Sequence, residues 1–128
     1  IYDTAGAVML SVNDLASAQF INDGKGGFHR EDLDFSLQVT PISAFINMGP
    51  AYLAGGNFFG VLPYEGQYDA AALMSFTLGK QMQRASVLDI KGQVRDLRRL
   101  HTAKYGDVLV VARNDEPLTF FTVSPAGH

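Results

Sequence analysis

Strict alternation of apolar and polar positions is clearest just after a glycine-rich loop. Every second residue from Leu33 to Val39 is apolar, and the residues between them are Asp, Ser and Gln. A period of two is typical of a strand with one buried face. Pro41 ends the predicted strand, because proline cannot donate a hydrogen bond to a ladder. A first strand is likewise predicted at residues 5–12, before the turn pair Asn13-Asp14.

The middle of the chain favours a helix. Residues 69–83 begin with Asp69, a good N-cap, and continue through an alanine-rich stretch. Met74, Leu78 and Met82 recur at helical spacing and would form one buried stripe. Short strands are predicted on either side, within residues 51–62 and at 87–90. We therefore expect this helix to pack its apolar stripe on a sheet.

A second helix is predicted at residues 93–105. Val94, Leu97 and Leu100 would line its apolar face, and Gly106 is placed to cap its end. Two apolar runs follow, at 107–113 and 118–124, and the four residues between them fit a hairpin turn. The predicted fold class is α+β: a mainly antiparallel sheet of five to seven strands with two helices, about 69–83 and 93–105. At 128 residues, the chain fits one domain over 1–128.

Charge is sorted along the chain although the net charge is only −3. Residues 1–79 contain eight acidic and two basic residues, whereas residues 80–128 contain eight basic and five acidic residues. Such asymmetry favours an anionic partner or contact between copies of the chain. Our leading hypothesis is a non-enzymatic scaffold or assembly module. It would form a homo-oligomer, or bind a protein partner, through complementary acidic (1–79) and basic (80–113) surfaces.

The basic segment supplies the candidate partner-binding residues. Arg95, Arg98 and Arg99 have the i, i+3, i+4 spacing that shares one helix face, and Lys104 follows them. Guanidinium groups on one face can pair with carboxylates of a protein or with phosphates. The alternative hypothesis is therefore a nucleic-acid-binding regulator that uses this helix face. The plain alternative is an amphipathic helix with a solvated arginine-rich side.

Catalytic signatures are weak throughout. The chain has no cysteine, which excludes disulfides, thiolate nucleophiles and zinc–thiolate sites, and it has no Gly-x-Ser-x-Gly elbow. The loop 24–27 is glycine-rich but lacks the Lys-Ser/Thr of a phosphate-binding loop. His29 and Glu31 would share a strand face and could hold a divalent cation loosely. A small-ligand or metal-binding domain near the glycine-rich loops stays a third hypothesis; we assign no catalytic residue and no cofactor.

Two families resemble parts of the chain. Residues 86–124 resemble the N-terminal half of prevent-host-death antitoxins, through the strand 87–90, the helix 94–100, and the run from Tyr105-Gly106-Asp107 to Pro117-Leu118. That resemblance implies a dimer that binds operator DNA. Residues 51–124 loosely resemble roadblock or longin-like domains, in their order of two short strands, an alanine-rich helix and three strands. That resemblance implies a dimeric scaffold for small GTPases or assembly partners.

The sequence leaves the cellular location open. The first residue is Ile1 rather than methionine, so we expect a processed or excised chain. Its apolar runs are only a few residues long, whereas a bilayer crossing takes about 20. We therefore expect no membrane insertion and assign no compartment.

Overall fold

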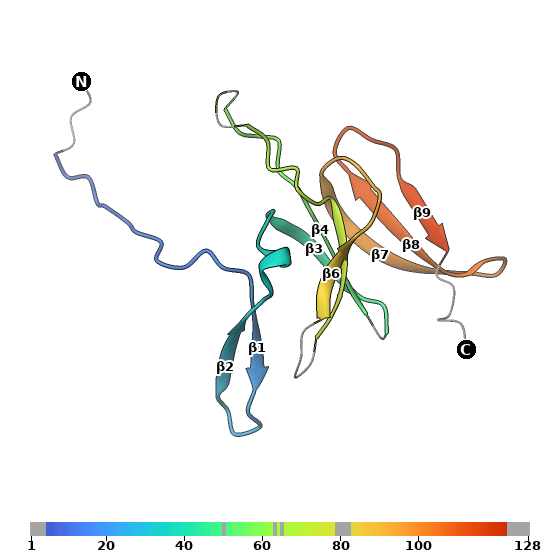
Figure 1. Cartoon of the computed structure of the whole chain (residues 1–128), viewed down its shortest axis with the longest axis horizontal. Coiled ribbons are helices and arrows are strands. Elements are labelled where there is room, and N and C mark those ends of the chain that lie inside the picture. The colour runs from blue at the N-terminus through green and yellow to red at the C-terminus, as the bar shows by residue number, and fades with distance from the viewer. Residues whose placement is uncertain (1–4, 50, 63, 65, 79–82, 123–128) are drawn as a thin grey trace.

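The computed structural model describes residues 5–49, 51–62, 64, 66–78 and 83–122, and it consists mostly of antiparallel strands. In the described residues the strands form three sheets, with orders β1-β2, β3-β4-β5-β6 and β7-β8-β9. Figure 1 shows the three sheets and a long N-terminal segment that leaves them. The strands are β1 (Ala18–Asn22), β2 (Phe28–Asp32), β3 (Ile42–Asn47), β4 (Tyr52–Gly56), β5 (Leu73–Thr77), β6 (Gln83–Val87), β7 (Val94–Thr102), β8 (Gly106–Arg113) and β9 (Thr119–Thr122).

The prediction of an α+β fold with two helices is wrong. Within 69–83, the residues Leu73–Thr77 form the inner strand β5, which pairs with β4 and β6. Leu73 faces one apolar cluster, whereas Met74 and Phe76 face another. A strand buried on both faces needs consecutive apolar residues, and such a run also satisfies helical spacing. Met82, the last residue of the predicted stripe, lies outside the described residues.

The predicted helix 93–105 is the long strand β7, for a different reason. The ladder between β7 and β8 has an irregularity between Val94 and Asp96, so Arg95 is an extra residue. This bulge brings Val94 and Leu97 to the same buried face although they are three residues apart. The third residue of the predicted apolar stripe, Leu100, is half exposed at 50%. A bulged strand therefore produced the spacing that indicated a helix.

The predicted strand at 33–39 is also absent from the described fold. Residues Phe35–Leu37 form a 3₁₀ turn, η1, and the Asp34 side chain caps it by accepting a hydrogen bond from the backbone N–H of Ser36. Leu37 is fully buried, whereas Phe35 points into solvent. The hydrogen bond to the Asp34 side chain therefore stabilises a turn where the alternating pattern predicts a strand.

The main core lies between the two larger sheets. Leu53 and Leu73, from β4 and β5, pack against side chains of β7 and β8. A side chain at Gly55 would collide with Val94, so glycine is needed where β4 approaches β7. On the other face of the four-stranded sheet, Leu37 of η1 covers a second cluster that includes Met74 and Phe76. The sheet β3-β4-β5-β6 is therefore covered on both sides.

The predicted C-terminal hairpin is present as β8 and β9, up to Thr122. Among the described residues there is no helix long and apolar enough to span a membrane.

Candidate assembly interface

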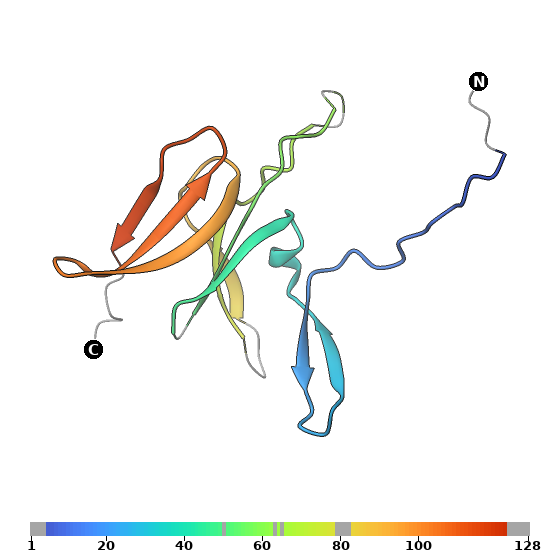
Figure 2. The same ribbon diagram turned by 180° about the vertical axis from the view of Figure 1, so that it is seen from behind.

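The N-terminal arm, residues 6–13, lies outside every described sheet. Its backbone is extended, and it runs away from the rest of the molecule in both views (Figures 1 and 2). Four large apolar side chains on it are exposed, with Met9 at 94%; the others are Val8, Leu10 and Val12. Within the described residues the arm makes no hydrogen bond. It is therefore an apolar segment without a strand partner among the described residues.

The arm has the residue pattern of a strand. Side chains alternate between faces in an extended chain, so Val8, Leu10 and Val12 share one face. No charged residue occurs from Ala5 to Asn13. The strand predicted at 5–12 is not part of a described sheet. The sequence thus has strand character at 5–12, and no described strand pairs with it.

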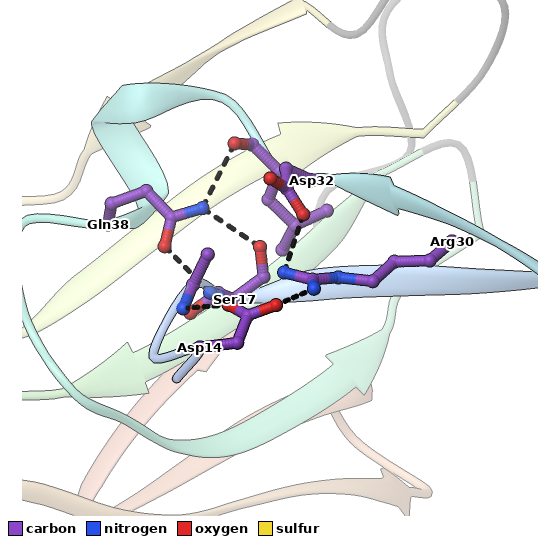
Figure 3. Close-up of polar contacts among 7 residues, drawn as sticks. Asp14, Ser17, Arg30, Asp32 and Gln38 are labelled. Carbon is purple, nitrogen blue, oxygen red and sulfur yellow. Dashed lines mark hydrogen bonds and ion pairs between the residues drawn. The ribbon is translucent and has the colours of Figure 1, made fainter. Parts of the chain in front are cut away.

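A polar clamp fixes the base of the arm to the body of the protein. The side-chain amide of Gln38 binds Ser17 on both sides: Oε1 accepts from the Ser17 N–H at 2.7 Å, and Nε2 donates to the Ser17 C=O at 2.8 Å. Nε2 also donates to the Leu33 C=O at 3.0 Å. Figure 3 shows this amide between the two backbone segments. One side chain after η1 therefore holds the start of β1 and the end of the β1–β2 hairpin together.

An arginine completes the clamp from β2. Arg30 forms ion pairs with Asp14, at the base of the arm, and with Asp32 at 2.7 Å (Figure 3). These groups are partly exposed, so the pairs are worth little individually. The two ion pairs nevertheless fix the orientation of the Arg30 side chain, because two carboxylates bind the same guanidinium group. We define the clamp as Asp14, Ser17, Arg30, Asp32 and Gln38.

Sequence reasoning did not find the clamp. Gln38 and Ser17 are 21 residues apart, and their contact depends on η1, where a strand was predicted. The sequence predicts no function for Arg30, because its neighbours His29 and Glu31 are the residues that suggest metal binding. The available signal was Asp14 just after an uncharged run of strand type.

The structure separates the arginines that were predicted to share one face. In β7, Arg98 pairs with Val110 of β8 and Arg99 pairs with Leu109, so these two side chains lie on opposite faces. Arg95 occupies the bulge. The common helix face proposed for them does not exist, because residues 94–102 are a strand.

Each candidate partner-binding residue also has an intrachain contact. Arg98 Nε donates to Asp96 Oδ2 at 2.9 Å, and Arg99 Nε lies 3.6 Å from Asp107 Oδ2. Arg95 Nη2 donates to Gln93 Oε1 at 2.7 Å, and its guanidinium lies over the Phe58 ring. Lys104 Nζ lies 4.7 Å from the centre of the Tyr105 ring. Much of the basic charge of β7 is thus balanced within the chain.

Asp107, the carboxylate at the start of β8, has a perturbed pKa. Nδ1 of His101 lies 2.9 Å from Asp107 Oδ1, and this hydrogen bond lowers the pKa of Asp107, with a further contribution from Arg99. A lowered pKa stabilises the fold at pH values above the usual carboxylate range. The stabilisation is lost as the pH falls through the folded-state pKa.

We expect His101→Ala to raise the pKa of Asp107 toward its ordinary value, because the main hydrogen bond that favours the carboxylate is removed. A carboxyl-carbon NMR titration measures this change. His29→Ala is the matched control and should leave Asp107 unchanged, since His29 lies on the separate β1–β2 hairpin. An unchanged Asp107 titration in His101→Ala would contradict the assignment.

The metal candidates His29 and Glu31 lie together, and the described part of the chain adds no third ligand beside them. His29 Nε2 is 3.2 Å from Glu31 Oε1 on the exposed face of β2, and Gln19 of β1 donates to Glu31 Oε2 at 2.9 Å. In the described residues no group of three or more His, Cys, Asp or Glu side chains is arranged to hold a metal ion. The glycine-rich loop beside them is a hairpin turn that Asp23 organises, with Oδ1 accepting from the Lys25 and Gly27 N–H groups.

An open cleft of about 770 Å³ lies beside the segment Gly55-Gly56-Asn57 at the end of β4. Asn57 at its wall has both ends of its amide bonded within the protein: Oδ1 accepts from Thr40 and Ala71, and Nδ2 donates to the Gly92 C=O. The charged residues around the cleft are Asp69, Asp89, Lys91 and Glu116. Acidic side chains on an open surface do not by themselves define a ligand.

Comparison with known proteins adds no family. The chain matches no protein-family model, no curated protein and no solved structure. The helices implied by both family resemblances overlap the strands β5 and β7.

Proposed function

We propose that this chain is a non-enzymatic assembly module that self-associates by donating its N-terminal arm. The supporting observation is an uncharged segment with a strand pattern that is exposed and pairs with no strand in the described part of its own chain. Extended segments of this kind are recognised by strand addition, in which main-chain hydrogen bonds and alternate side-chain contacts act together. A second copy of the chain, present at the same concentration, supplies a sheet edge to which the arm can add.

The energetics favour association. Burying an aliphatic side chain is worth about 1.5–3 kcal/mol, so the stripe Val8, Leu10 and Val12 offers about 5–9 kcal/mol before entropic costs. Those costs are reduced because the clamp already fixes the base of the arm. Both ends of the Gln38 amide and the Arg30 ion pairs serve this purpose.

Charge complementarity between residues 1–79 and 80–113 is the secondary part of the proposal. The carboxylate partners of Arg98 and Arg99 leave less free basic charge than the sequence indicates. Salt separates the two contributions. Association through charge should weaken between about 0.05 and 0.5 M salt as screening shortens, whereas burial of apolar surface should persist.

We expect the double variant Leu10→Asp/Val12→Asp to weaken self-association by about 100-fold or more, which corresponds to about 2.7 kcal/mol. Two carboxylates would enter the apolar stripe of the arm and lose hydration there. Sedimentation equilibrium over a range of protein concentrations measures the effect.

The matched control is Ser11→Asp/Asn13→Asp, which adds the same charge on the other face of the arm. It should change the association constant by less than about tenfold. An unmodified chain that is monomeric at every protein and salt concentration would overturn the proposed function. If the two double variants weakened self-association equally, the apolar stripe would have no specific role in it.

A further inference from the structure

We infer that the arm of one copy adds as a fourth strand to the outer edge of β9 in a second copy. This inference rests on the proposed self-association and names its acceptor. β9 is the outer strand in the order β7-β8-β9, and its outer edge has no strand partner among the described residues. Adding the arm there would produce the order β7-β8-β9-arm.

The composition of β9 suits this role. Residues 118–122 contain no charge, and Leu118, Phe120 and Phe121 are exposed. An uncharged edge with exposed aromatic side chains is a template for another strand unless something covers it. The arm is uncharged as well, so neither surface loses a hydrated charge when they meet.

Three of the other described edges, those of β2, β7 and β3, fit less well. β2 carries four consecutive polar and charged residues, His29 to Asp32, and β7 carries arginines. Charged side chains on an edge oppose pairing with another strand. β3 already packs against β7 of the same chain. The apolar groove of about 410 Å³ between β1 and β3, which includes Phe45, is the main competing acceptor.

The face of the added strand follows from side-chain alternation. Phe120 pairs with Val110 of β8, which pairs with Arg98 of β7, so these side chains share the outer face of the sheet. Leu100, two residues after Arg98, lies on that face too and is half exposed. The stripe Val8, Leu10 and Val12 would continue this apolar surface beside Phe120. Eight extended residues span about 26 Å, more than the four residues of β9 require.

The positions of donor and acceptor determine the type of assembly. The arm leaves one end of the molecule, and the sheet β7-β8-β9 lies at the other end (Figures 1 and 2). Because the donor and the acceptor lie at opposite ends, we expect each copy to donate its arm to one neighbour and to accept the arm of another, a head-to-tail contact that produces a ring or an open filament. We therefore expect assemblies larger than dimers.

Cysteine cross-linking of the full chain tests this inference, because the natural sequence contains no cysteine. The variant Leu10→Cys/Phe120→Cys is treated with a short bismaleimide, which tolerates a shift in register. We expect a covalent ladder of dimers, trimers and larger species on a denaturing gel. Each single-cysteine variant can join at most two chains.

The matched control is Leu10→Cys/Phe45→Cys, since Phe45 is also exposed, at 54%, but lines the competing groove. We expect its trimer and larger species to be at least tenfold less abundant. A ladder that requires Phe45→Cys instead of Phe120→Cys would overturn the β9 assignment and keep self-association. Dimers alone from Leu10→Cys/Phe120→Cys would overturn the head-to-tail arrangement. If the unmodified chain were monomeric, the proposed function would be contradicted as well.

Discussion

Met74→Asp is expected to unfold the domain. Met74 is fully buried at 0% exposure, in the cluster that also contains Leu37 and Phe76. Aspartate there would bury a carboxyl group without a partner and would also remove apolar contacts. Losses above about 4–5 kcal/mol follow from such changes, and whole domains are stable by only about 5–15 kcal/mol.

Circular dichroism and thermal unfolding measure this effect, and Met9→Asp is the matched control. Met9 receives the same substitution but is almost fully exposed on the arm. It should leave the melting temperature nearly unchanged, since surface substitutions alter stability by about 0.5 kcal/mol or less. A Met74→Asp variant with an unchanged melting temperature would contradict the burial of β5 between two clusters.

The failed helix prediction at 69–83 has the same physical origin. Period-two alternation appears only when one face of a strand meets solvent. In β5 the alternation is short: Leu73 and Met74 are consecutive apolar residues that face β7 and β8 on one side and η1 on the other, and only Ser75 and Thr77 are polar. The information needed to recognise the strand is the second covering layer, which is set by residues far away in the chain.

Local irregularities explain the other errors. The bulge at Arg95 gives β7 a three-residue spacing of buried positions, which matches a helix equally well. At 33–39 the alternation is genuine, but Asp34 and Gln38 bind backbone groups that a strand would use in a ladder. Hydrogen bonds from polar side chains therefore decided the conformation of both the 3₁₀ turn and the clamp.

The candidate interface was partly visible in the sequence. Residues 5–12 have strand character, and that preference predicts what the arm can do when it meets an edge. The proposed acceptor, β9, lies in the segment 118–124 that the sequence predicts as a strand. What the sequence could not show is that the donor and the acceptor are not paired within one chain. That fact depends on the clamp at Gln38 and Arg30 and on the opposite placement of the arm and β9.

Asn57→Leu is expected to destabilise the protein by about 3–5 kcal/mol. Asn57 is buried, and its Oδ1 accepts from the Ala71 N–H at 3.1 Å, while its Nδ2 donates to the Gly92 C=O at 3.1 Å. Leucine would leave both backbone groups without these partners, and each unsatisfied group costs about 1–3 kcal/mol. The backbone of Asn57 also has φ of 75°, which asparagine tolerates better than leucine.

Asn57→Gly separates these two causes. Glycine accepts the positive φ without strain, so the stability that Asn57→Gly loses should reflect the missing hydrogen bonds alone. This loss should be smaller than that of Asn57→Leu by about 1–2 kcal/mol. Asn47→Ala is the exposed control: the Asn47 side chain accepts from the Gly49 N–H at 2.8 Å, and the variant should lose about 0.5–1 kcal/mol of stability. Urea unfolding measures the free energy of unfolding of the three variants. The comparison holds when its dependence on urea concentration, the m-value, is the same in all three. Equal stability of Asn57→Leu and Asn47→Ala would show that this buried amide does not join the turn after β4 to the start of β5 and the approach to β7.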